Sequence, residues 1–377
     1  MTETKVLHVI TGLSTGGAET MLFKYLVNSD TTRITHEVIA LTRWGDVASK
    51  IEDYGIKVYA LNMRGIFQTL IGFLKLFFII YRARPDIVQT WMYHSDFFAG
   101  VVSKILGVKK IIWNIRNTSL DPKSSKKSTI FIRKICSRLS FLIPNKIILC
   151  AESAAKLHQN IGYDSSKFHI IGNGFDTVAF APSIKDSQII RDELKINDKT
   201  FVVSSIARFD KQKDHKNFLR TAAIVSNYYE DVVFILCGLR INWENTLLVS
   251  WIKQFKLDGK VRLLNKRNDI SSIMNASDVI CSSSRYGEAF PNILGESLLC
   301  GTPCIATDIG DSKKIIKKYG LTVPENDSTE MFFALKKFLD MKTGEIQKIG
   351  SLGRSHIMKN YDIKKISQKY DELYLKS

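Results

Sequence analysis

Acidic residues are scarce in this sequence relative to basic ones. There are 37 Asp and Glu against 54 Lys and Arg, which leaves a formal net charge of +17 over 377 residues. An excess of this size indicates a negatively charged partner, and nucleic acid, anionic lipid and a phosphorylated substrate all fit it. The charge alone does not choose among these three partner classes.

Paired cysteines are also lacking. The six cysteines form no CxxC pair and no Cys/His spacing of a zinc site. The N-terminus lacks the charged and then apolar layout of a signal peptide. We therefore expect reduced thiols in a cytosolic protein.

Long hydrophobic runs are nearly absent as well. The strongest candidate, residues 65–81, has about the minimum length that spans a bilayer, but Lys75 lies near its middle. This favours a buried or half-buried helix of a soluble domain over a spanning helix.

With 45% hydrophobic residues the chain can bury real cores, which excludes a disordered protein and a lone minidomain.

Short β-rich runs alternate with helical stretches along the whole chain, which predicts parallel sheets of βαβ units. A polar segment, about 176–199, interrupts this rhythm, so we place a domain boundary there and expect two similar α/β domains. The predicted strands are Lys5–Ile10, Glu37–Thr42, Ile56–Leu61, Asp86–Thr90, Lys110–Ile115, Lys146–Cys150 and Phe168–Ile171, then Phe201–Ala207, Val232–Cys237, Val261–Leu264, Val279–Ser282 and Pro303–Thr307.

The first predicted strand runs into a glycine-rich turn, Gly12-x3-Gly16-Gly17-Ala18-Glu19. Such a turn lets the backbone approach a phosphate or a sugar closely at a helix N-terminus, although it can also be merely a turn. It is not the GxGxxG of dinucleotide-binding proteins, and the chain has no GxxxxGK[ST]. Phosphoryl transfer on a P-loop is therefore not expected.

The strand FVVSSIA leads into ARFDKQKD, where Arg208 and Lys213 lie five residues apart. A guanidinium and an ammonium just outside a sheet suit a diphosphate, whose charge they neutralise as it departs. The alternative is a solvated charged loop.

The stretch GEAFPNILGES predicts a short helix that begins at Pro291 and ends at Gly301. Its N-terminus lies behind Glu288, and the backbone N–H groups of Ala289 to Asn292, Phe290 included, are candidates to bind phosphate or sugar oxygens. Glu288 and Glu296 could each hold a pair of hydroxyls, one on a sugar and one on a ribose. The alternative is an ordinary surface helix.

Together, Glu288-x7-Glu296, GGAE at 16–19, IGNGFD at 171–176 and Arg208 with Lys213 resemble the family-4 retaining glycosyltransferases of the GT-B fold. The resemblance spans nearly the whole chain. It implies two Rossmann-like parallel-sheet domains that face each other across a cleft, and a final helix, about Ile363 to Leu375, that crosses back to the first domain. The implied domains are 1–180 with about 360–377 for the acceptor, and 181–359 for the nucleotide sugar.

The resemblance also implies roles for single residues. Arg208 and Lys213 would hold the diphosphate, Glu296 the ribose, and Glu288 with the backbone of residues 289–292 the donor sugar. Gly16 and Gly17 would pack against the diphosphate. Many members carry a histidine after the strand that here reads KKIIWNIRNTS, and in this sequence Arg116, or alternatively Asn114, takes its place as a contact of sugar or acceptor. Arg116 could instead only pair with a neighbouring loop.

No two aspartates are spaced as DxD, the arrangement by which the other large class of glycosyltransferases holds a divalent metal. The seven histidines show no metal-ligand spacing. We therefore expect neither a metal nor another cofactor.

Ten of the basic residues lie between Lys109 and Lys146, against the single acid Asp121. Here cations alternate with Ile, Phe and Leu, as in an amphipathic helix on an anionic membrane. A solvated helix face is the alternative; nucleic acid is not expected, because no binding module accompanies the charge. The expected membrane patch is Lys126, Lys127, Arg133, Lys134 and Arg138.

The expected function is transfer of a sugar, with retention of configuration, from a nucleoside diphosphate sugar to a hydroxyl of a lipid-linked or membrane-proximal glycan, as in bacterial O-antigen or capsule synthesis. The expected location is the cytoplasm, at the inner face of the plasma membrane. Two alternatives are a nucleotide-sugar epimerase of similar fold and a non-catalytic basic protein that binds nucleic acid or lipid.

Overall fold

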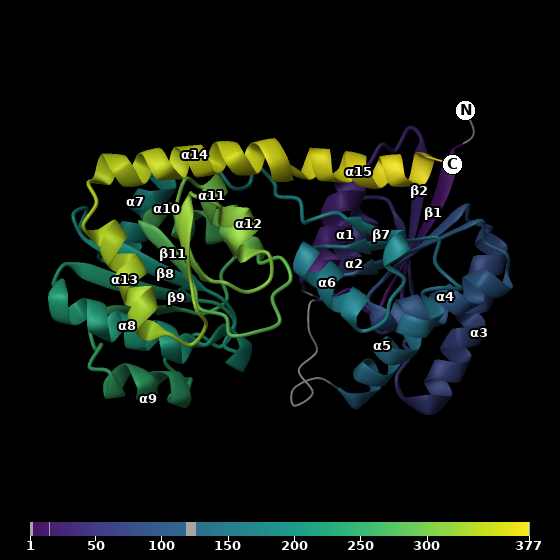
Figure 1. The fold of residues 1–377 in the computed structure, drawn as a ribbon, viewed down its shortest axis with the longest axis horizontal. Coiled ribbons are helices and arrows are strands. Elements are labelled where there is room, and N and C mark those ends of the chain that lie inside the picture. Colours follow the sequence, from purple (N-terminus) through teal and green to yellow (C-terminus); the bar gives the residue numbers. More distant parts are fainter. Residues whose placement is uncertain (1–2, 15, 118–125, 377) are drawn as a thin grey trace. The chain divides into compact units, whose positions relative to one another are not determined.

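The chain forms two compact units, seen in a computed structural model that describes residues 3–14, 16–117 and 126–376 (Figure 1). Unit 1 consists of Met1–Gly174 and Ile363–Ser377, and unit 2 consists of Phe175–Asp362. The sequence placed these divisions at residue 180 and at about residue 360.

In its described residues, unit 1 contains a seven-stranded parallel sheet with the order β3-β2-β1-β4-β5-β6-β7. The order runs outward from β1 in both directions, as in doubly wound α/β folds. All seven strands expected in this half are present. They are β1 (Thr4–Ile10), β2 (Ile34–Ala40), β3 (Lys57–Ala60), β4 (Ile87–Trp91), β5 (Lys110–Ile115), β6 (Lys146–Leu149) and β7 (Phe168–Ile170).

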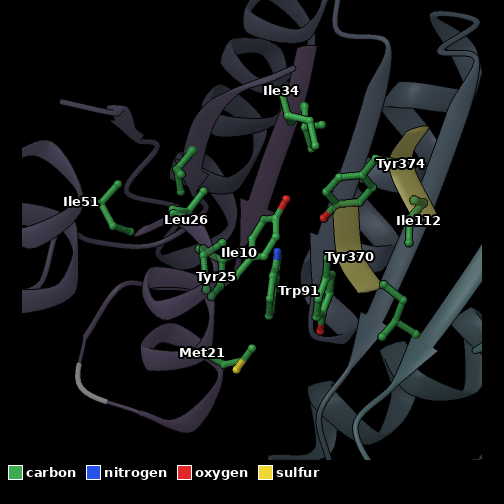
Figure 2. Packing of buried hydrophobic residues seen from close by; sticks show 14 of the residues in the cluster. Ile10, Met21, Tyr25, Leu26, Ile34, Ile51, Trp91, Ile112, Tyr370 and Tyr374 are labelled. Atoms are coloured by element: carbon green, nitrogen blue, oxygen red, sulfur yellow. The ribbon is translucent and has the colours of Figure 1, made fainter. Parts of the chain in front are cut away.

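Helices cover both faces of this sheet, because its strands carry apolar side chains on both sides. Val6 and Ile10 of β1 share a core with α1, α2 and α15 (Figure 2), while Leu7 and Val9 share a second core with α3 and α4. The helices of unit 1 are α1 (Gly17–Asn28), α2 (Asp46–Asp53), α3 (Gly65–Ala83), α4 (Tyr93–Ile105), α5 (Lys127–Leu139), α6 (Glu152–Asn160), the 3-10 helix η1 (Ser165–Lys167) and α15 (Ile363–Leu375).

The last helix, α15, belongs to unit 1 although it follows unit 2 in the sequence. Asp371 accepts hydrogen bonds from the Tyr25 hydroxyl (2.7 Å), the Ser29 hydroxyl (2.9 Å) and the backbone N–H of Asp30 (3.0 Å). Tyr370 stacks on Trp91 within the same core (Figure 2). The expected return of the final helix to the first domain is confirmed.

The apolar segment expected to be a buried or half-buried helix forms α3. Leu76 and Ile80 on its inner side are buried in the core with Leu7 and Val9. The opposite side of α3 is apolar as well and lies exposed. The sequence did not predict this exposed apolar face.

Unit 2 contains, in its described residues, a six-stranded parallel sheet with the order β10-β9-β8-β11-β12-β13. Chain order reverses between β8 and β11, so the topological switch point lies between these two strands. Its strands are β8 (Phe201–Ile206), β9 (Val232–Cys237), β10 (Val261–Leu264), β11 (Val279–Ser282), β12 (Cys304–Thr307) and β13 (Gly320–Val323).

Two elements of unit 2 were absent from the sequence prediction. The polar segment 176–199 contains a helix, and Gly320–Val323 adds an edge strand to the sheet. The helices of unit 2 are α7 (Ile184–Glu193), η2 (Lys211–Lys213), α8 (His215–Tyr228), α9 (Thr246–Gln254), α10 (Ile270–Ala276), α11 (Asn292–Leu299), α12 (Ser312–Ile316), α13 (Ser328–Leu339) and α14 (Thr343–Tyr361). The predicted pair of parallel-sheet α/β domains is confirmed.

Candidate active site

The loop after β8 carries both predicted cations. The chain leaves the strand at Ile206 and forms η2, whose N-cap Asp210 accepts a hydrogen bond from the backbone of Gln212. Asp214 then adopts a left-handed conformation (φ 45°) and caps α8. This tight sequence of turns fixes the backbone of Arg208 and Lys213 at the carboxyl edge of the sheet.

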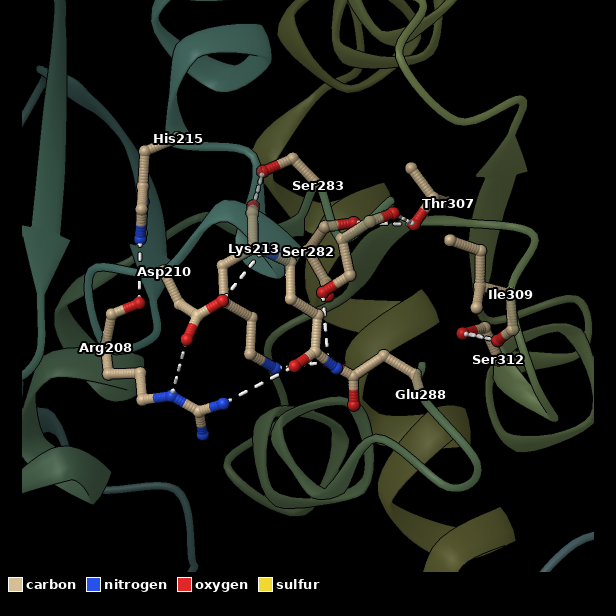
Figure 3. A network of polar contacts seen from close by, with 12 residues as sticks. Arg208, Asp210, Lys213, His215, Ser282, Ser283, Glu288, Thr307, Ile309 and Ser312 are labelled. Carbon is tan, nitrogen blue, oxygen red and sulfur yellow. Dashed lines mark hydrogen bonds and ion pairs between the residues drawn. The ribbon is translucent and has the colours of Figure 1, made fainter. Parts of the chain in front are cut away.

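The loop after β11 brings Glu288 to the same place, because β8 and β11 are neighbouring parallel strands. Glu288 forms an ion pair with Lys213 and accepts hydrogen bonds from the Ser284 hydroxyl (3.1 Å) and the Gln212 amide (3.3 Å) (Figure 3). The two charged side chains are only 20% and 14% exposed. Lys213 and Glu288, which the sequence assigned to different parts of a donor, are thus direct partners.

Arg208 is held more loosely than Lys213. Its side chain is 56% exposed and lies 3.4 Å both from the Asp210 carboxylate and from the Gln212 amide oxygen. An exposed guanidinium with long contacts can turn toward an anionic ligand at little cost, since such pairs contribute little to stability. The two cations therefore offer one mobile and one fixed positive charge.

His215 positions the backbone of Arg208. The ring donates a hydrogen bond from Nε2–H to the Arg208 carbonyl (3.0 Å), since a carbonyl can only accept, and it stacks on Phe209 (Figure 3). Burial, the largest cause, lowers the pKa of His215, and the charge of Lys213 acts in the same direction. The ring is therefore neutral at pH 7 and has a positioning role.

The predicted helix behind Glu288 is α11, with Pro291 at its N-cap rather than at its first helical position. Phe290 is buried and stacks on Phe175 at 6.0 Å. Gly295 makes this packing possible, because a Cβ there would lie 2.2 Å from the Phe175 ring. Glu296 lies half-buried on the second turn of α11.

A third loop supports the second one and was not assigned by sequence. Gly310, after β12, has φ 62°, and a Cβ there would lie 2.3 Å from the Glu288 carbonyl oxygen. The backbone N–H of Asp311 donates to the Ala289 carbonyl (3.0 Å). The segment TDIGD carried a signal for this loop, because a glycine follows the end of β12 by three residues. Gln212 and Ser284 had no comparable signal in the sequence.

In unit 1 the glycine-rich turn lies after β1, beside the switch point between β1 and β4. Gly16 is the N-cap of α1, and a Cβ on it would lie 2.4 Å from the Glu19 carboxylate. A Cβ on Gly17 would meet nothing within 4 Å. A Cβ on Gly16 would displace only the flexible end of the Glu19 side chain, so local packing within unit 1 requires neither Gly16 nor Gly17.

Arg116 and Asn114, the candidates for the family histidine, lie at the end of β5. Arg116 is 9% exposed, lies over the Trp91 ring and donates to the Tyr370 hydroxyl (3.2 Å). Asn114 is fully buried and donates to the same hydroxyl (3.2 Å). Both side chains are thus held against α15, and their role toward a sugar or an acceptor stays a prediction.

The predicted membrane patch centres on α5. Lys127, Lys134 and Arg138 are exposed at helical spacing together with Phe131, which is 65% exposed. Arg133 is half-buried on another side of the helix, and Lys126 is the exposed N-cap. Residues 118–125 of the basic segment, including Asp121, lie outside the described residues.

Within residues 3–14, 16–117 and 126–376, no group of three or more His, Cys, Asp or Glu is placed to hold a metal ion. All six cysteines are buried and unpaired with one another.

Two family models cover most of the chain. The model described as Glycosyltransferase Family 4 matches residues 15–178, and the model described as Glycosyl transferases group 1 matches residues 186–356. The chain belongs to glycosyltransferase family 4. The first match covers most of unit 1 and the second most of unit 2, and the resemblance inferred from the motifs is confirmed.

Curated relatives of this family member are transferases as well. It is 25% identical, over 80% of its length and 78% of the relative's, to the UDP-Gal:alpha-D-GlcNAc-diphosphoundecaprenol alpha-1,3-galactosyltransferase of Escherichia coli. It is 24% identical, over 96% and 97%, to the N,N'-diacetylbacillosaminyl-diphospho-undecaprenol alpha-1,3-N-acetylgalactosaminyltransferase of Campylobacter jejuni. The epimerase and the non-catalytic binding protein find no support in these matches.

Solved structures show that the fold is GT-B. The Anabaena protein HepE, in complex with UDP, has a TM-score of 0.85 and 19% identity, with 98% of this chain and 99% of that chain covered. The lipopolysaccharide outer core galactosyltransferase WaaB has a TM-score of 0.73 and 14% identity, with 98% of both chains covered. The predicted fold class and glycosyltransferase activity are confirmed.

Proposed function

We propose that this glycosyltransferase moves a sugar, with retention of configuration and without a metal ion, from a nucleoside diphosphate sugar to a hydroxyl of a polyprenyl-diphosphate-linked glycan in bacterial surface-polysaccharide synthesis. One observation carries the proposal. Arg208, Lys213 and Glu288 meet where β8 and β11 end, at the switch point of a parallel sheet, which is where open α/β sheets bind ligands.

The two cations serve the leaving group in this proposal. Lys213 and Arg208 neutralise the charge that develops on the diphosphate as the glycosidic bond breaks. Their loop is fixed in advance by η2 and by the His215 contact, so little reorganisation is needed during the reaction. Lys213 exchanges part of its contact with Glu288 for a phosphate oxygen.

Glu288 has two roles in this proposal. It holds Lys213 in place, and its carboxylate accepts hydrogen bonds from hydroxyls of the donor sugar. The backbone of Ala289, Phe290 and Asn292, anchored by the Phe290 and Gly310 packing, supplies further donors to that sugar or to phosphate. Glu296 accepts hydrogen bonds from the ribose diol.

No protein base is needed at the reacting carbon. The departing diphosphate oxygen leaves on the same face from which the acceptor hydroxyl attacks, and it helps to remove the hydroxyl proton. Orientation of donor and acceptor and stabilisation of the diphosphate supply the rate enhancement.

We infer the acceptor and the location from the relatives and from the exposed cations of α5. The Escherichia coli and Campylobacter jejuni relatives are named for acceptors linked to undecaprenol diphosphate, a lipid that resides in a membrane. The exposed cations of α5 suit an anionic surface. A cytoplasmic enzyme that binds peripherally to the inner face of the plasma membrane satisfies both.

Thermal unfolding with UDP, GDP, ADP and dTDP tests the donor class. A nucleotide at 100 times its Kd adds about 2.7 kcal/mol to the free energy of unfolding, which is readily measured. NMR coupling of the anomeric proton in the product, made on a short-chain polyprenyl-diphosphate sugar, tests retention. Stabilisation by none of the nucleotides, or an inverted product, contradicts the proposal.

A further inference from the structure

The outer face of α3 is a continuous stripe of large apolar side chains open to solvent. The exposed members recur at spacings of three and four residues, which places them on one side of the helix. They are Ile66 (86% exposed), Phe67 (74%), Leu70 (62%), Ile71 (40%), Leu74 (59%), Phe78 (60%) and Tyr81 (56%). Exposed apolar surface of this extent on one helix marks an interaction site.

The inner face of the same helix packs in the core of unit 1. Leu76 and Ile80 are at most 1% exposed and belong to the core of unit 1, and Gly72 packs closely on Met63. By length and composition α3 could cross a membrane, and only 17% of its most apolar stretch is buried inside the protein. Since one side is packed on the protein, α3 lies along the surface of unit 1 rather than spanning a bilayer.

Positive charge borders the stripe. Gln68, Lys75 and Arg82 are spaced by seven residues, so they form a narrow polar strip along one edge of the apolar face. Arg64 and Arg84 are exposed at the two ends of the helix, and α3 contains no Asp or Glu. This is the layout of an interfacial helix, with cations at the depth of lipid headgroups.

We propose that the outer face of α3 inserts into the headgroup and acyl boundary of an anionic bilayer leaflet and is the main membrane anchor of the enzyme. The proposal deepens the proposed function, on which it rests for the lipid-linked acceptor. Helix α4 contacts both α3 and α5, and in this proposal the α5 cations attract the anionic surface from a distance. Charge therefore brings the enzyme to the membrane, and α3 holds it there.

Charge complementarity favours lipid over a second copy of the chain. A symmetric dimer through this face would bring Lys75, Arg82, Arg64 and Arg84 of both copies together, with no acid on α3 to pair with them. An anionic leaflet supplies the missing negative charge and accepts the apolar side chains.

A fluorophore on α3 tests insertion directly. Because all six native cysteines are buried, a Leu74→Cys variant can be labelled at one position with an environment-sensitive dye. We expect a blue shift of its emission on addition of vesicles of mixed phosphatidylethanolamine and phosphatidylglycerol. The matched control is Ile184→Cys on α7 of unit 2, which is 90% exposed and should show no shift.

A second experiment measures the contribution to binding. The double variant Leu70→Ser with Leu74→Ser should reduce vesicle affinity at least about tenfold, because two exposed leucines lose their burial in lipid. The control Ile184→Ser should bind as the wild type does. The loss should persist at high salt, where attraction by exposed cations is screened.

Three outcomes overturn the inference: no blue shift at position 74, equal vesicle affinity of the double variant, or a wild-type dimer that the double variant converts to a monomer without loss of vesicle binding. Nucleotide binding of the double variant, followed by thermal unfolding, should equal that of the wild type and shows that it is folded. If nucleotides fail to bind the wild type while the blue shift is observed, the proposed function fails and the membrane anchor stands.

Discussion

Positive side chains have acidic partners at the carboxyl edge of the unit 2 sheet, whereas those on the outer helices α3 and α5 of unit 1 have no acid on their own helix. At the sheet edge three cations have an acidic partner: Lys213 with Glu288, Arg208 with Asp210, and Arg285 with Asp214. The helices α3 and α5 contain no acidic residue. Two cations on α3 and four on α5 therefore have no acid on their own helix, whereas the three site cations are paired.

Lys and Arg therefore have different roles in the two regions. The Lys213–Glu288 pair is largely removed from water, so its charges are held in place and act at short range, which suits the stabilisation of a transition state. Uncompensated charges on exposed helices stay solvated and act over about a Debye length, which suits attraction to a surface. Variants in the two regions should accordingly fail in different assays.

The largest effect should come from the paired cations. We expect Arg208→Ala or Lys213→Ala to lower kcat about 100-fold, since loss of one preorganised charge donor costs about 3 kcal/mol in the transition state. Steady-state kinetics at saturating donor measure this. The matched control is Lys211→Ala, an exposed cation of the same turn, which should keep wild-type activity. Wild-type turnover in either site variant would remove the diphosphate assignment.

The two glutamates should show a smaller loss and divide it between binding and catalysis. Glu296→Gln should weaken binding of the free nucleoside diphosphate about tenfold, because charged hydrogen bonds to the ribose are lost. Glu288→Gln should leave that affinity nearly intact and lower kcat, since contacts to the sugar count most in the transition state. Calorimetry with the nucleoside diphosphate and kinetics separate the two. Equal loss of nucleotide affinity in both variants would contradict the assignment.

A still smaller effect should follow from the cations of α5. The triple change of Lys127, Lys134 and Arg138 to Gln should reduce affinity for anionic vesicles about fivefold at low salt, and the difference should vanish at high salt. Arg133→Gln is the control, because Arg133 is half-buried on another side of the helix. Co-sedimentation across a salt series measures both. A salt-independent loss, or an equal loss in the control, would show that the exposed face of α5 is not an electrostatic attractor.

The smallest expected effect is that of a chelator. Activity should be unchanged in EDTA, because positive side chains at the switch point take the place of a metal at the diphosphate. The assay follows product formation before and after chelation. Activity lost in EDTA and restored by Mn²⁺ or Mg²⁺ would require a metal site. The paired cations would then not be sufficient to neutralise the diphosphate.

The sheet framework of both units was predictable because its signal is local. Runs such as those of β1, β8 and β9 are short, apolar and β-branched, and each is followed by a helical stretch. The final helix was placed from the family resemblance at the residues where it occurs. The edge strand β13 was not found, since Gly320 and Thr322 weaken its apolar pattern.

The contacts within the site were less predictable. Lys213 and Glu288 were both identified, but their pairing depends on β8 and β11 being neighbours, which the order of residues along the chain does not reveal. The exposed outer face of α3 could not be predicted for a different reason. A helix that is apolar on nearly all sides gives no periodicity to separate the side that faces the core from the side that does not.

The return of α15 to unit 1 also sets the order in which the protein can mature on the ribosome. The hydrogen-bond acceptors for Tyr25, Ser29 and Asp30 lie on Asp371, and Tyr370 and Tyr374 complete the core around Trp91. Domains generally fold as units during synthesis, with the N-terminal one first. Because α15 follows all of unit 2 in the sequence, the core of unit 1 cannot be completed until unit 2 has been translated.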